Sequence, residues 1–200
     1  QGEGGVVALD FEYLRAVEKL CRERDVLLLV DEVQTGAGRT GRFLACEHAG
    51  IRPDVVTLAK GLGGGLPVGA CLCAERLGGV MGPGTHGSTF GGNPVVCAAG
   101  RYMLSRLSDP DFLAQVARKG EVFRRRLSAM PHVAEVRGLG MMLGVKLDKG
   151  SSREAAEKCL ENGLLILTAK TLLRLLPPLN ISEEEMDRGL SILESTLAAL

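Results

Sequence analysis

Apolar positions along the chain alternate between helical spacing and short continuous runs. Apolar residues recur every three or four positions after Asp10, which predicts a capped amphipathic helix that continues to about Arg24. Residues 26–30 are wholly apolar, as expected for a parallel strand covered on both faces, and residues 54–58 predict a second buried strand. A third apolar run at 68–74 predicts another strand. Helix followed by strand, repeated in this way, predicts an α/β layered domain.

The pattern changes after Pro94, and a domain boundary is expected near residues 92–100. Residues 95–107 have helical spacing, and Asp109-Pro110 begins a longer helix. The remaining predicted elements are four strands at residues 133–137, 141–147, 164–168 and 172–176, and two helices that begin after Ser151 and Ser182. A Glu stands three residues after each of these serines, which is the pattern of a capping box. These elements predict a compact α+β unit.

Composition excludes several classes of protein. The 24 Lys+Arg residues are balanced by 24 Asp+Glu, so no basic face is expected for nucleic acid or a membrane surface. Hydrophobic residues make up 46% of the chain, which is enough to build a core. No apolar run approaches the ~20 residues that span a bilayer, and no signal peptide opens the chain. The sequence begins at Gln1 without a methionine, as expected for the middle of a longer sequence.

Cysteine and histidine spacing gives no sign of a metal site or a disulfide framework. The six cysteines form no C-x-x-C pair: Cys21, Cys46, Cys71, Cys73, Cys97 and Cys159. Most have apolar neighbours, which is typical of buried free thiols. Only three histidines occur, and they are scattered along the chain. We therefore expect a reducing, cytoplasmic location.

Glycines cluster after one particular lysine. Twelve of the 27 glycines lie between Lys60 and Gly92, and Lys60 itself follows an apolar strand. In a partly buried site walled by glycine, burial would disfavour the charged ammonium and make the amine nucleophilic. Asp31 ends the neighbouring apolar run, where parallel sheets bind ligands. The pair suggests Schiff-base chemistry with pyridoxal phosphate, in which an acid keeps the ring nitrogen protonated. The alternative is a solvated lysine that opens a surface loop.

Two other phosphate-binding motifs fit the sequence poorly. An apolar strand ending in Asp31-Glu32 is similar to the magnesium-binding strand of P-loop ATPases, but that class needs a G-x-x-x-x-G-K-[ST] loop. The nearest stretch, residues 36–43, has Arg-Phe in place of Lys-Ser/Thr. Gly36, Gly38 and Gly41 match G-x-G-x-x-G, yet they do not follow the strand directly and open no clear helix. Neither motif therefore predicts ATP or NAD binding here.

Three motifs at fixed spacing surround Asp31 and Lys60. They are Asp-Glu-Val-Gln-Thr-Gly at 31–36 with Gly-Arg-Thr-Gly at 38–41, Thr-Leu-Ala-Lys-Gly at 57–61, and His-Gly-Ser-Thr-Phe-Gly-Gly-Asn-Pro at 86–94. On these motifs the chain resembles class III (fold type I) aminotransferases, in register over essentially all 200 residues. The resemblance implies an α/β fold in which residues 1–94 are the C-terminal part of a large pyridoxal-phosphate-binding domain with a parallel-rich sheet. Residues 95–200 would be the small C-terminal α+β domain.

The resemblance also implies how the cofactor is held. Lys60 would carry pyridoxal phosphate as a Schiff base, and Asp31 would bind the pyridine nitrogen. Gln34 would contact the phenolic oxygen of the ring, and Val33 would pack against one ring face. No metal is implied.

Four further residues are assigned by resemblance to the phosphate and the substrate. Thr89, with Ser88 beside it, would reach the cofactor phosphate of the neighbouring subunit in a homodimer. Arg174 matches the arginine that binds the substrate α-carboxylate, for which a guanidinium fork is suited. Glu3 matches a glutamate that pairs with that arginine and masks it while an amine lacking a free α-amino group binds by its other end.

Each of these residues also has a purely structural interpretation. Arg174 could be a strand residue with a solvated head, Glu3 a loop acid and Thr89 a turn hydroxyl. His48 and His86 are interpreted as structural, because amino transfer of this kind needs no histidine.

The implied reaction moves the terminal amino group of N2-acetylornithine to 2-oxoglutarate, giving N-acetylglutamate semialdehyde and glutamate, as in arginine biosynthesis. Ornithine, succinylornithine, succinyldiaminopimelate, 4-aminobutyrate and acetyl-lysine are alternative donors, because enzymes acting on them share most of these motifs. The chain corresponds to about the C-terminal half of the family's length. A second hypothesis is therefore a catalytically incomplete fragment, or a partner awaiting the other half.

Overall fold

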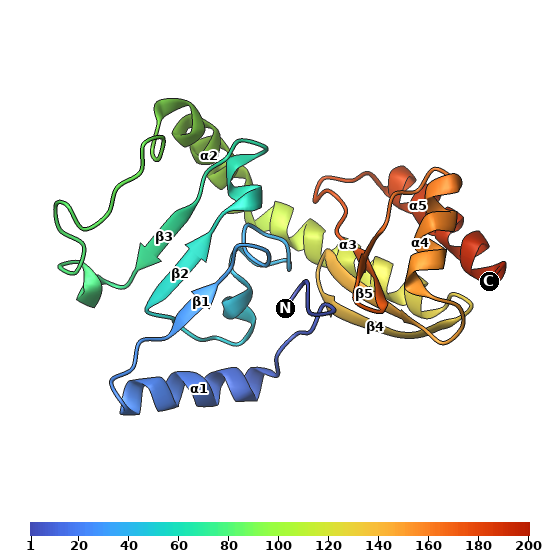
Figure 1. The fold of residues 1–200 in the computed structure, drawn as a ribbon, viewed down its shortest axis with the longest axis horizontal. Helices are drawn as coiled ribbons and strands as arrows, with labels where there is room; N and C mark the ends of the chain where they lie inside the picture. The colour runs from blue at the N-terminus through green and yellow to red at the C-terminus, as the bar shows by residue number, and fades with distance from the viewer. The chain divides into compact units, whose positions relative to one another are not determined.

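The computed structural model describes residues 1–200, which form two compact units (Figure 1). The first unit comprises Leu9–Leu113, and the second comprises Gln1–Ala8 together with Ala114–Leu200. The predicted division between residues 94 and 95 lies inside the first unit, at the start of α2 (Pro94–Leu107). Helix α2 stays with the first unit because it packs on the turn after Lys60, where a Cβ on Gly64 would lie 2.8 Å from Met103 Cγ.

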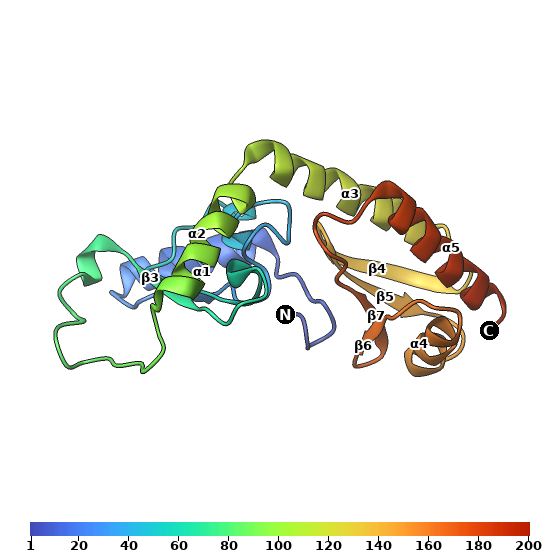
Figure 2. The same cartoon turned by 90° about the horizontal axis from the view of Figure 1, so that it is seen from above.

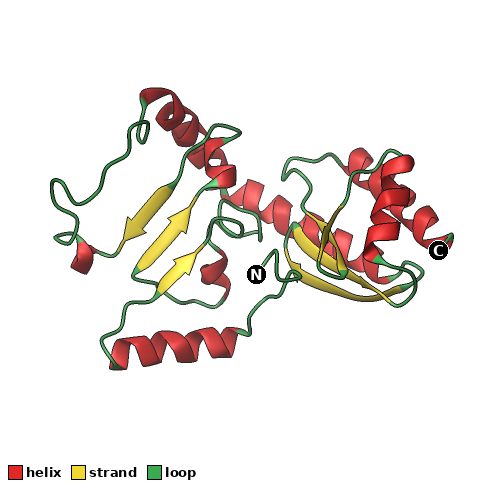
Figure 3. Ribbon diagram, in the orientation of Figure 1, coloured by secondary structure: helices red, strands yellow, loops and turns green.

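The first unit is built around a three-stranded sheet. Its elements are α1 (Phe11–Glu23), β1 (Leu29–Asp31), the 3-10 helix η1 (Ala45–His48), β2 (Val55–Leu58), the 3-10 helix η2 (Lys60–Gly63), β3 (Ala70–Cys73), the 3-10 helix η3 (Glu75–Leu77) and α2. The strand order is β1-β2-β3, with β1 and β2 parallel and β3 antiparallel to β2. In Figure 3 these strands form a sheet of their own, separate from the sheet of the second unit. The predicted parallel pair is confirmed, and the third strand runs the other way.

Side chains of this sheet alternate between a covered face and an open face. Val56 and Leu58 of β2 are buried and pack with Leu62, whereas Val55 and Thr57 are half-buried. On the edge strands, Leu29 is 63% exposed and Leu72 is 50% exposed. The prediction that the first strand is covered on both faces is therefore wrong for this structure. Both edge strands have a neighbour on one side only, and the helical core packs against a single face.

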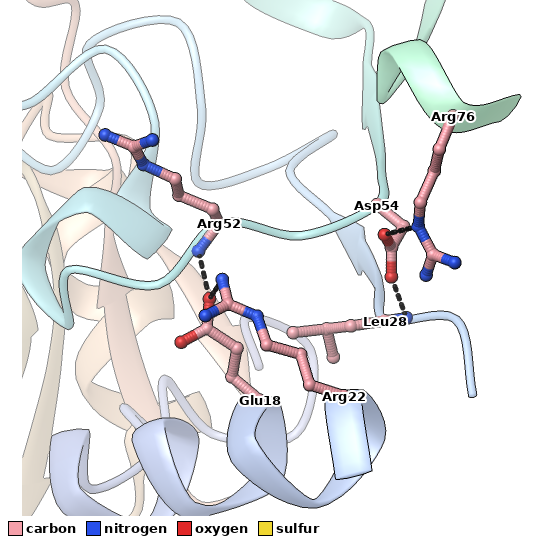
Figure 4. A network of polar contacts seen from close by, with 6 residues as sticks. All are labelled: Glu18, Arg22, Leu28, Arg52, Asp54 and Arg76. Carbon is pink, nitrogen blue, oxygen red and sulfur yellow. Dashed lines mark hydrogen bonds and ion pairs between the residues drawn. The ribbon is translucent and has the colours of Figure 1, made fainter. Parts of the chain in front are cut away.

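A polar network closes the end of the sheet where β1 and β2 begin (Figure 4). Arg52 donates its backbone N–H to Glu18 Oε1 of α1 at 2.7 Å. Asp54 accepts from the backbone N–H of Leu28 at 2.9 Å and from Arg76 Nε at 2.8 Å. The network therefore joins α1, the segments leading into β1 and β2, and η3.

The second unit contains a four-stranded antiparallel sheet and three helices. Its elements are α3 (Pro110–Ser128), which starts within the first unit, β4 (Val133–Leu139), β5 (Met142–Leu147), α4 (Ser152–Glu161), β6 (Leu167–Ala169), β7 (Leu172–Leu175) and α5 (Glu183–Ala198). The strand order is β4-β5-β7-β6. Helices α3 and α5 lie next to each other (Figure 2) and are joined by an ion pair between Arg126 and Asp187. All four strands and all three helices predicted here are present, although β6 begins only at Leu167.

Local signals fix the helix ends in both units. Asp10 accepts from Tyr13 N at 2.9 Å at the start of α1, and Ser182 with Glu185 forms the predicted capping box of α5. Ser151 accepts from Glu154 N at 3.1 Å at the start of α4. None of the helices combines the length and apolar character needed to cross a membrane.

Candidate functional site

Asp31 lies at the carboxyl end of β1, directly opposite Thr57 of the parallel strand β2. Its Oδ1 atom accepts hydrogen bonds from Thr57 Oγ1 at 3.1 Å and from Val33 N at 2.9 Å. Both bonds use the same oxygen, so the carboxylate is held in place while Oδ2 remains available to a ligand. Asp31 is exposed, as a ligand-binding acid at the end of a strand must be.

Lys60 follows β2 and begins η2 at the same edge of the sheet. Its backbone has φ 46, in the left-handed region that non-glycine residues rarely adopt and that is often found at functional sites. The side chain is exposed, so the prediction of a partly buried lysine is wrong for this structure. The glycines that follow Lys60 carry no side chains to cover it, and Leu62 is turned into the core at 5% exposure.

The loop after β1 and the turn after β2 lie together. Val33 and Gln34 are half-buried in the loop that follows Asp31. A Cβ on Gly61, next to Lys60, would lie 3.5 Å from Ala37 Cβ of that same loop. The structure therefore places these four predicted residues on two adjoining segments at the carboxyl end of one parallel strand pair.

Glu32 is a residue whose position the sequence interpretation missed. It is 1% exposed, its Oε1 accepts from Cys46 N at 2.8 Å, and its Oε2 accepts from Thr35 Oγ1. Its own backbone N–H donates to Thr57 O at 2.9 Å. Burial, followed by the charge of Glu32, raises the pKa of the Cys46 thiol to about 12, which keeps that thiol protonated. The alternation of side chains along a strand could have predicted the burial of Glu32, because Glu32 lies two residues after Val30 and shares its covered face.

Gly36 closes the same loop tightly. Its N–H donates to Glu32 O at 2.9 Å, and a Cβ added to it would lie 2.6 Å from Leu58 Cδ2 and 2.8 Å from Glu32 O. No side chain fits there, so glycine is required by contact with the core. His48 lies near this loop in a structural role, stacked on Phe11 with 6.2 Å between ring centroids. Burial lowers the pKa of His48, which favours the neutral ring.

Ser88 and Thr89 are exposed and lie in a long segment between η3 and α2. Ser88 Oγ accepts from Gly91 N at 2.9 Å, which makes a local turn. Neither residue hydrogen-bonds to the group at the end of β1 and β2. The predicted approach of Thr89 to a partner's cofactor therefore stays a prediction.

The glycines between Lys60 and Gly92 differ in how closely they are packed against neighbouring atoms. Near Lys60, Gly63 and Gly64 are closely packed, since a Cβ on Gly63 would lie 2.8 Å from Val68 Cγ1 and one on Gly64 would lie 2.8 Å from Met103 Cγ, whereas a Cβ on Gly65 would meet nothing within 4 Å. Further along, added side chains would meet nothing within 4 Å at five positions, namely Gly79, Gly82, Gly84, Gly87 and Gly92. Close packing thus explains Gly63 and Gly64, and again Gly91, where a Cβ would lie 2.6 Å from Ser88 Oγ, but it does not explain these five positions.

The six free cysteines differ in burial, and Cys21 is half-buried. Cys46 and Cys159 are buried as predicted, but Cys71, Cys73 and Cys97 are exposed. Cys71 and Cys73 lie on the edge strand β3, in which every residue is exposed. No three His, Cys, Asp or Glu side chains gather as a metal site would require.

Glu3 and Arg174 meet in the second unit. Arg174 lies on β7, and its side chain is 10% exposed while Nη1 donates to Glu3 Oε1. Its Nε atom is buried without a hydrogen-bond partner, so one donor of the guanidinium is unsatisfied. The predicted pairing of these two residues is therefore present, while their role toward substrate stays a prediction.

Comparison with known proteins assigns the chain to a family. The family model described as "Aminotransferase class-III" matches residues 1–197. The chain therefore belongs to the class III aminotransferases, with the partial fold type I architecture described above.

Two curated relatives show how similar the chain is to individual members of the family. The chain is 50% identical over 201 residues to acetylornithine aminotransferase of Haemophilus ducreyi, covering 100% of the chain and 51% of that protein. It is 44% identical to acetylornithine aminotransferase of Bacillus subtilis, covering 99% of the chain and 52% of the relative. The chain thus spans about half the length of the curated relatives it matches.

Solved structures show the same fold. Ornithine aminotransferase of Toxoplasma gondii, solved with partial occupancy of PLP at its active site, superposes with a TM-score of 0.92 at 38% identity. That match covers 100% of this chain and 49% of the other. N-acetylornithine aminotransferase of Stenotrophomonas maltophilia gives a TM-score of 0.88 at 38% identity, covering 100% and 54% of the two chains.

Proposed function

We propose that this chain forms the C-terminal half of a pyridoxal-phosphate-dependent aminotransferase acting on N2-acetylornithine and 2-oxoglutarate. The observation that carries the proposal is the placement of Asp31 and Lys60 at the carboxyl ends of two adjacent parallel strands. The names of the curated relatives support acetylornithine as the amino donor. The products would be N-acetylglutamate semialdehyde and glutamate, in arginine biosynthesis.

The residues present fit the cofactor that class III aminotransferases use. Asp31 is fixed through Oδ1 and offers Oδ2, as a carboxylate that holds a protonated ring nitrogen must. Lys60 offers an exposed amine for covalent attachment at the same edge. Val33 and Gln34 follow on the loop whose geometry Glu32 and Gly36 fix. When bound, pyridoxal phosphate supplies an electron-withdrawing ring that stabilises a carbanion at the substrate carbon.

The residues of this chain would have the following roles in the reaction. Lys60 Nζ would remove the proton from the carbon of the donor that bears the amino group, and in the second half of the reaction it would deliver a proton to the α-carbon of the new glutamate. Asp31 keeps the proton on the ring nitrogen through its negative charge. Arg174 binds the α-carboxylate of 2-oxoglutarate and glutamate, and Glu3 covers Arg174 while the terminal amine reacts.

Assembly belongs to the same proposal. A homodimer in which Thr89 reaches the partner's cofactor phosphate is supported by the exposure of Ser88 and Thr89 and by the open space around the glycines beside them. A cytoplasmic location is supported by the six free cysteines.

Covalent trapping of the cofactor tests the role of Lys60. The chain is incubated with pyridoxal phosphate, reduced with sodium borohydride and analysed by peptide mass spectrometry. We expect the modification at Lys60, its loss in Lys60→Ala, and no change in Lys149→Ala, a control at another exposed lysine. Equal modification of several lysines, or multiple turnover by the Lys60→Ala enzyme, would contradict the assignment.

A second candidate is a non-catalytic chain that needs the other half of the family's length. The exposed apolar side chains Leu29 and Leu72 on the two edge strands favour it. Trapping at Lys60 only after an upstream half has been added would support this candidate over a self-sufficient pocket. The identity of the donor is tested by assaying the reconstituted enzyme with acetylornithine, ornithine, succinylornithine, succinyldiaminopimelate and 4-aminobutyrate, among which we expect acetylornithine to give the highest kcat/KM.

A further inference from the structure

One side chain fastens the segment Gln1–Ala8 to the sheet of the second unit. Val6 is 3% exposed, whereas its neighbour Val7 is 37% exposed. We infer that Val6 is a positioning residue that seats the segment carrying Glu3 and thereby sets the Glu3–Arg174 pair. The consequence for substrate choice rests on the function proposed for Arg174, but the seating itself does not.

The seat for Val6 is made by glycines of two neighbouring strands. A Cβ added to Gly144 of β5 would lie 2.9 Å from Val6 Cβ and 3.1 Å from Val6 Cγ2. A Cβ added to Gly138 of β4 would lie 2.9 Å from Val6 Cγ1, but it would clash first with Met142 O of the same hairpin, which is closer still. Val6 therefore fills the space that a side chain at Gly144 would otherwise occupy, and it also lies against Gly138. Leu172 of β7 borders the seat, because its Cδ1 would lie 3.2 Å from the same added Cβ on Gly144.

The seat is adjacent to the arginine. Gly144 pairs with Arg174 across β5 and β7, so Val6 contacts the residue directly opposite Arg174 in the sheet. Residues directly opposite each other on antiparallel strands have Cα atoms about 4.5–5.5 Å apart. A shift of Val6 in its seat would therefore displace the segment next to the guanidinium.

The turn that holds Glu3 is closed by the backbone of Val6 itself. Gly2 O accepts hydrogen bonds from Gly5 N at 3.2 Å and from Val6 N at 3.1 Å, so Glu3 lies inside the closed turn. Val6 has φ 52, a left-handed conformation that is a real outlier for a β-branched residue. Such a conformation persists only where surrounding contacts enforce it. Here the glycine seat and the two bonds to Gly2 provide those contacts.

Loosening this seat should uncover Arg174. Glu3 is the one acidic residue of the segment Gln1–Ala8, and its side chain is 71% exposed even while it contacts Arg174. Without Val6 in place, Glu3 would spend less time on Arg174, and the guanidinium would become open to other reagents and to α-carboxylates.

The test uses the chain itself and needs no catalysis. Hydrogen exchange of the peptide covering residues 1–8 reports the seating, and the rate at which phenylglyoxal modifies Arg174 reports the pair. In Val6→Ala we expect lost protection of that peptide and roughly tenfold faster modification of Arg174, the factor that about 1.4 kcal/mol produces. Val7→Ala is the matched control and should change neither measurement.

Two further variants separate the seat from the pair. Glu3→Gln should speed the modification of Arg174 while leaving the peptide protected. Gly144→Ala should act like Val6→Ala, because the new methyl group occupies the seat. If Val6→Ala does not fold, Val6→Thr keeps the side-chain volume but buries a hydroxyl group among apolar neighbours, which should loosen the segment in the same direction.

The proposal is overturned if Val6→Ala or Val6→Thr matches Val7→Ala in both measurements. In an active, reconstituted enzyme, loss of the seat should also lower the preference for terminal amines over α-amino acids. If the peptide loses protection but the preference for terminal amines is unchanged, the seating of the segment by Val6 stands. The proposed role of the Glu3–Arg174 pair in substrate choice is then contradicted.

Discussion

At the residue scale, the candidate site depends on buried side chains that hold the ligand-binding candidates in position. Asp31 and Lys60 would do the chemistry, but the loop that carries Val33 and Gln34 is held by Glu32. That carboxylate is buried and accepts from Cys46 N and Thr35 Oγ1. A buried acceptor that satisfies a backbone donor is costly to remove, because the donor loses its partner.

Removing the Glu32 carboxylate should therefore loosen the site and destabilise the first unit. We expect Glu32→Ala to lower the free energy of unfolding by about 1–3 kcal/mol, since Cys46 N would be left buried without an acceptor. Glu32→Gln should cost less, because its amide oxygen can still accept. Urea unfolding measures both variants, with Glu75→Gln as an exposed control. A Glu32→Ala protein as stable as the control would show that the buried bonds contribute nothing.

At the element scale, the polar network of Figure 4 joins elements that are far apart in the sequence. Asp54 precedes β2 and bonds to Leu28 before β1 and to Arg76 of η3. The hydrogen bond from Arg76, followed by that from the backbone N–H of Leu28, lowers the pKa of Asp54. The charged form is thus favoured in the folded state.

This lowered pKa predicts a pH-dependent contribution to stability. Because the folded pKa lies below the unfolded one, ionised Asp54 stabilises the fold above the ordinary aspartate pKa of about 3.9. That contribution is lost as the pH falls through the lowered value. Asp54→Asn should be less stable than the parent at neutral pH, and the difference should shrink below about pH 4. The urea midpoints of the variant and the parent, compared at several pH values from neutral to acidic, measure this difference in stability.

The control for this prediction is Glu161→Gln, which removes an exposed carboxylate at the end of α4. The control should show no such pH-dependent difference. If Asp54→Asn kept a constant difference from the parent at every pH, the ionised form of Asp54 would not be the stabilising species.

At the scale of the whole molecule, the chain matches class III aminotransferases along its length but spans about half of its relatives. Its first sheet has two edge strands with exposed apolar side chains, and exposed strand edges are ready to pair with further chain. We expect the other half of the family's length to cover these strands.

Thiol labelling tests this covering directly. Cys71 and Cys73 lie on the edge strand β3 and are exposed, whereas Cys46 and Cys159 are buried internal controls. Iodoacetamide should alkylate the first two in the chain alone, and adding the upstream half of the Haemophilus ducreyi relative should slow that reaction. Unchanged labelling of Cys71 and Cys73 after a complex has formed would place the covering elsewhere.

The sequence by itself determined the local elements and, through the three motifs, the family. Asp10, Ser151 and Ser182 cap their helices, since capping depends on residues only a few positions apart. Motif spacing likewise predicted Asp31 and Lys60 as candidate site residues, and both stand at the ends of apolar runs that become parallel strands.

Only the tertiary structure decided what depends on residues distant in the chain. It placed Glu32 in the core, left Lys60 exposed, ran β3 antiparallel to β2 and brought Glu3 to Arg174 through the seat of Val6. The physical reason is that burial and pairing follow from strand register and from which faces are covered. Gly144 shows this plainly, because a side chain there would occupy the space that Val6 fills from the other end of the chain.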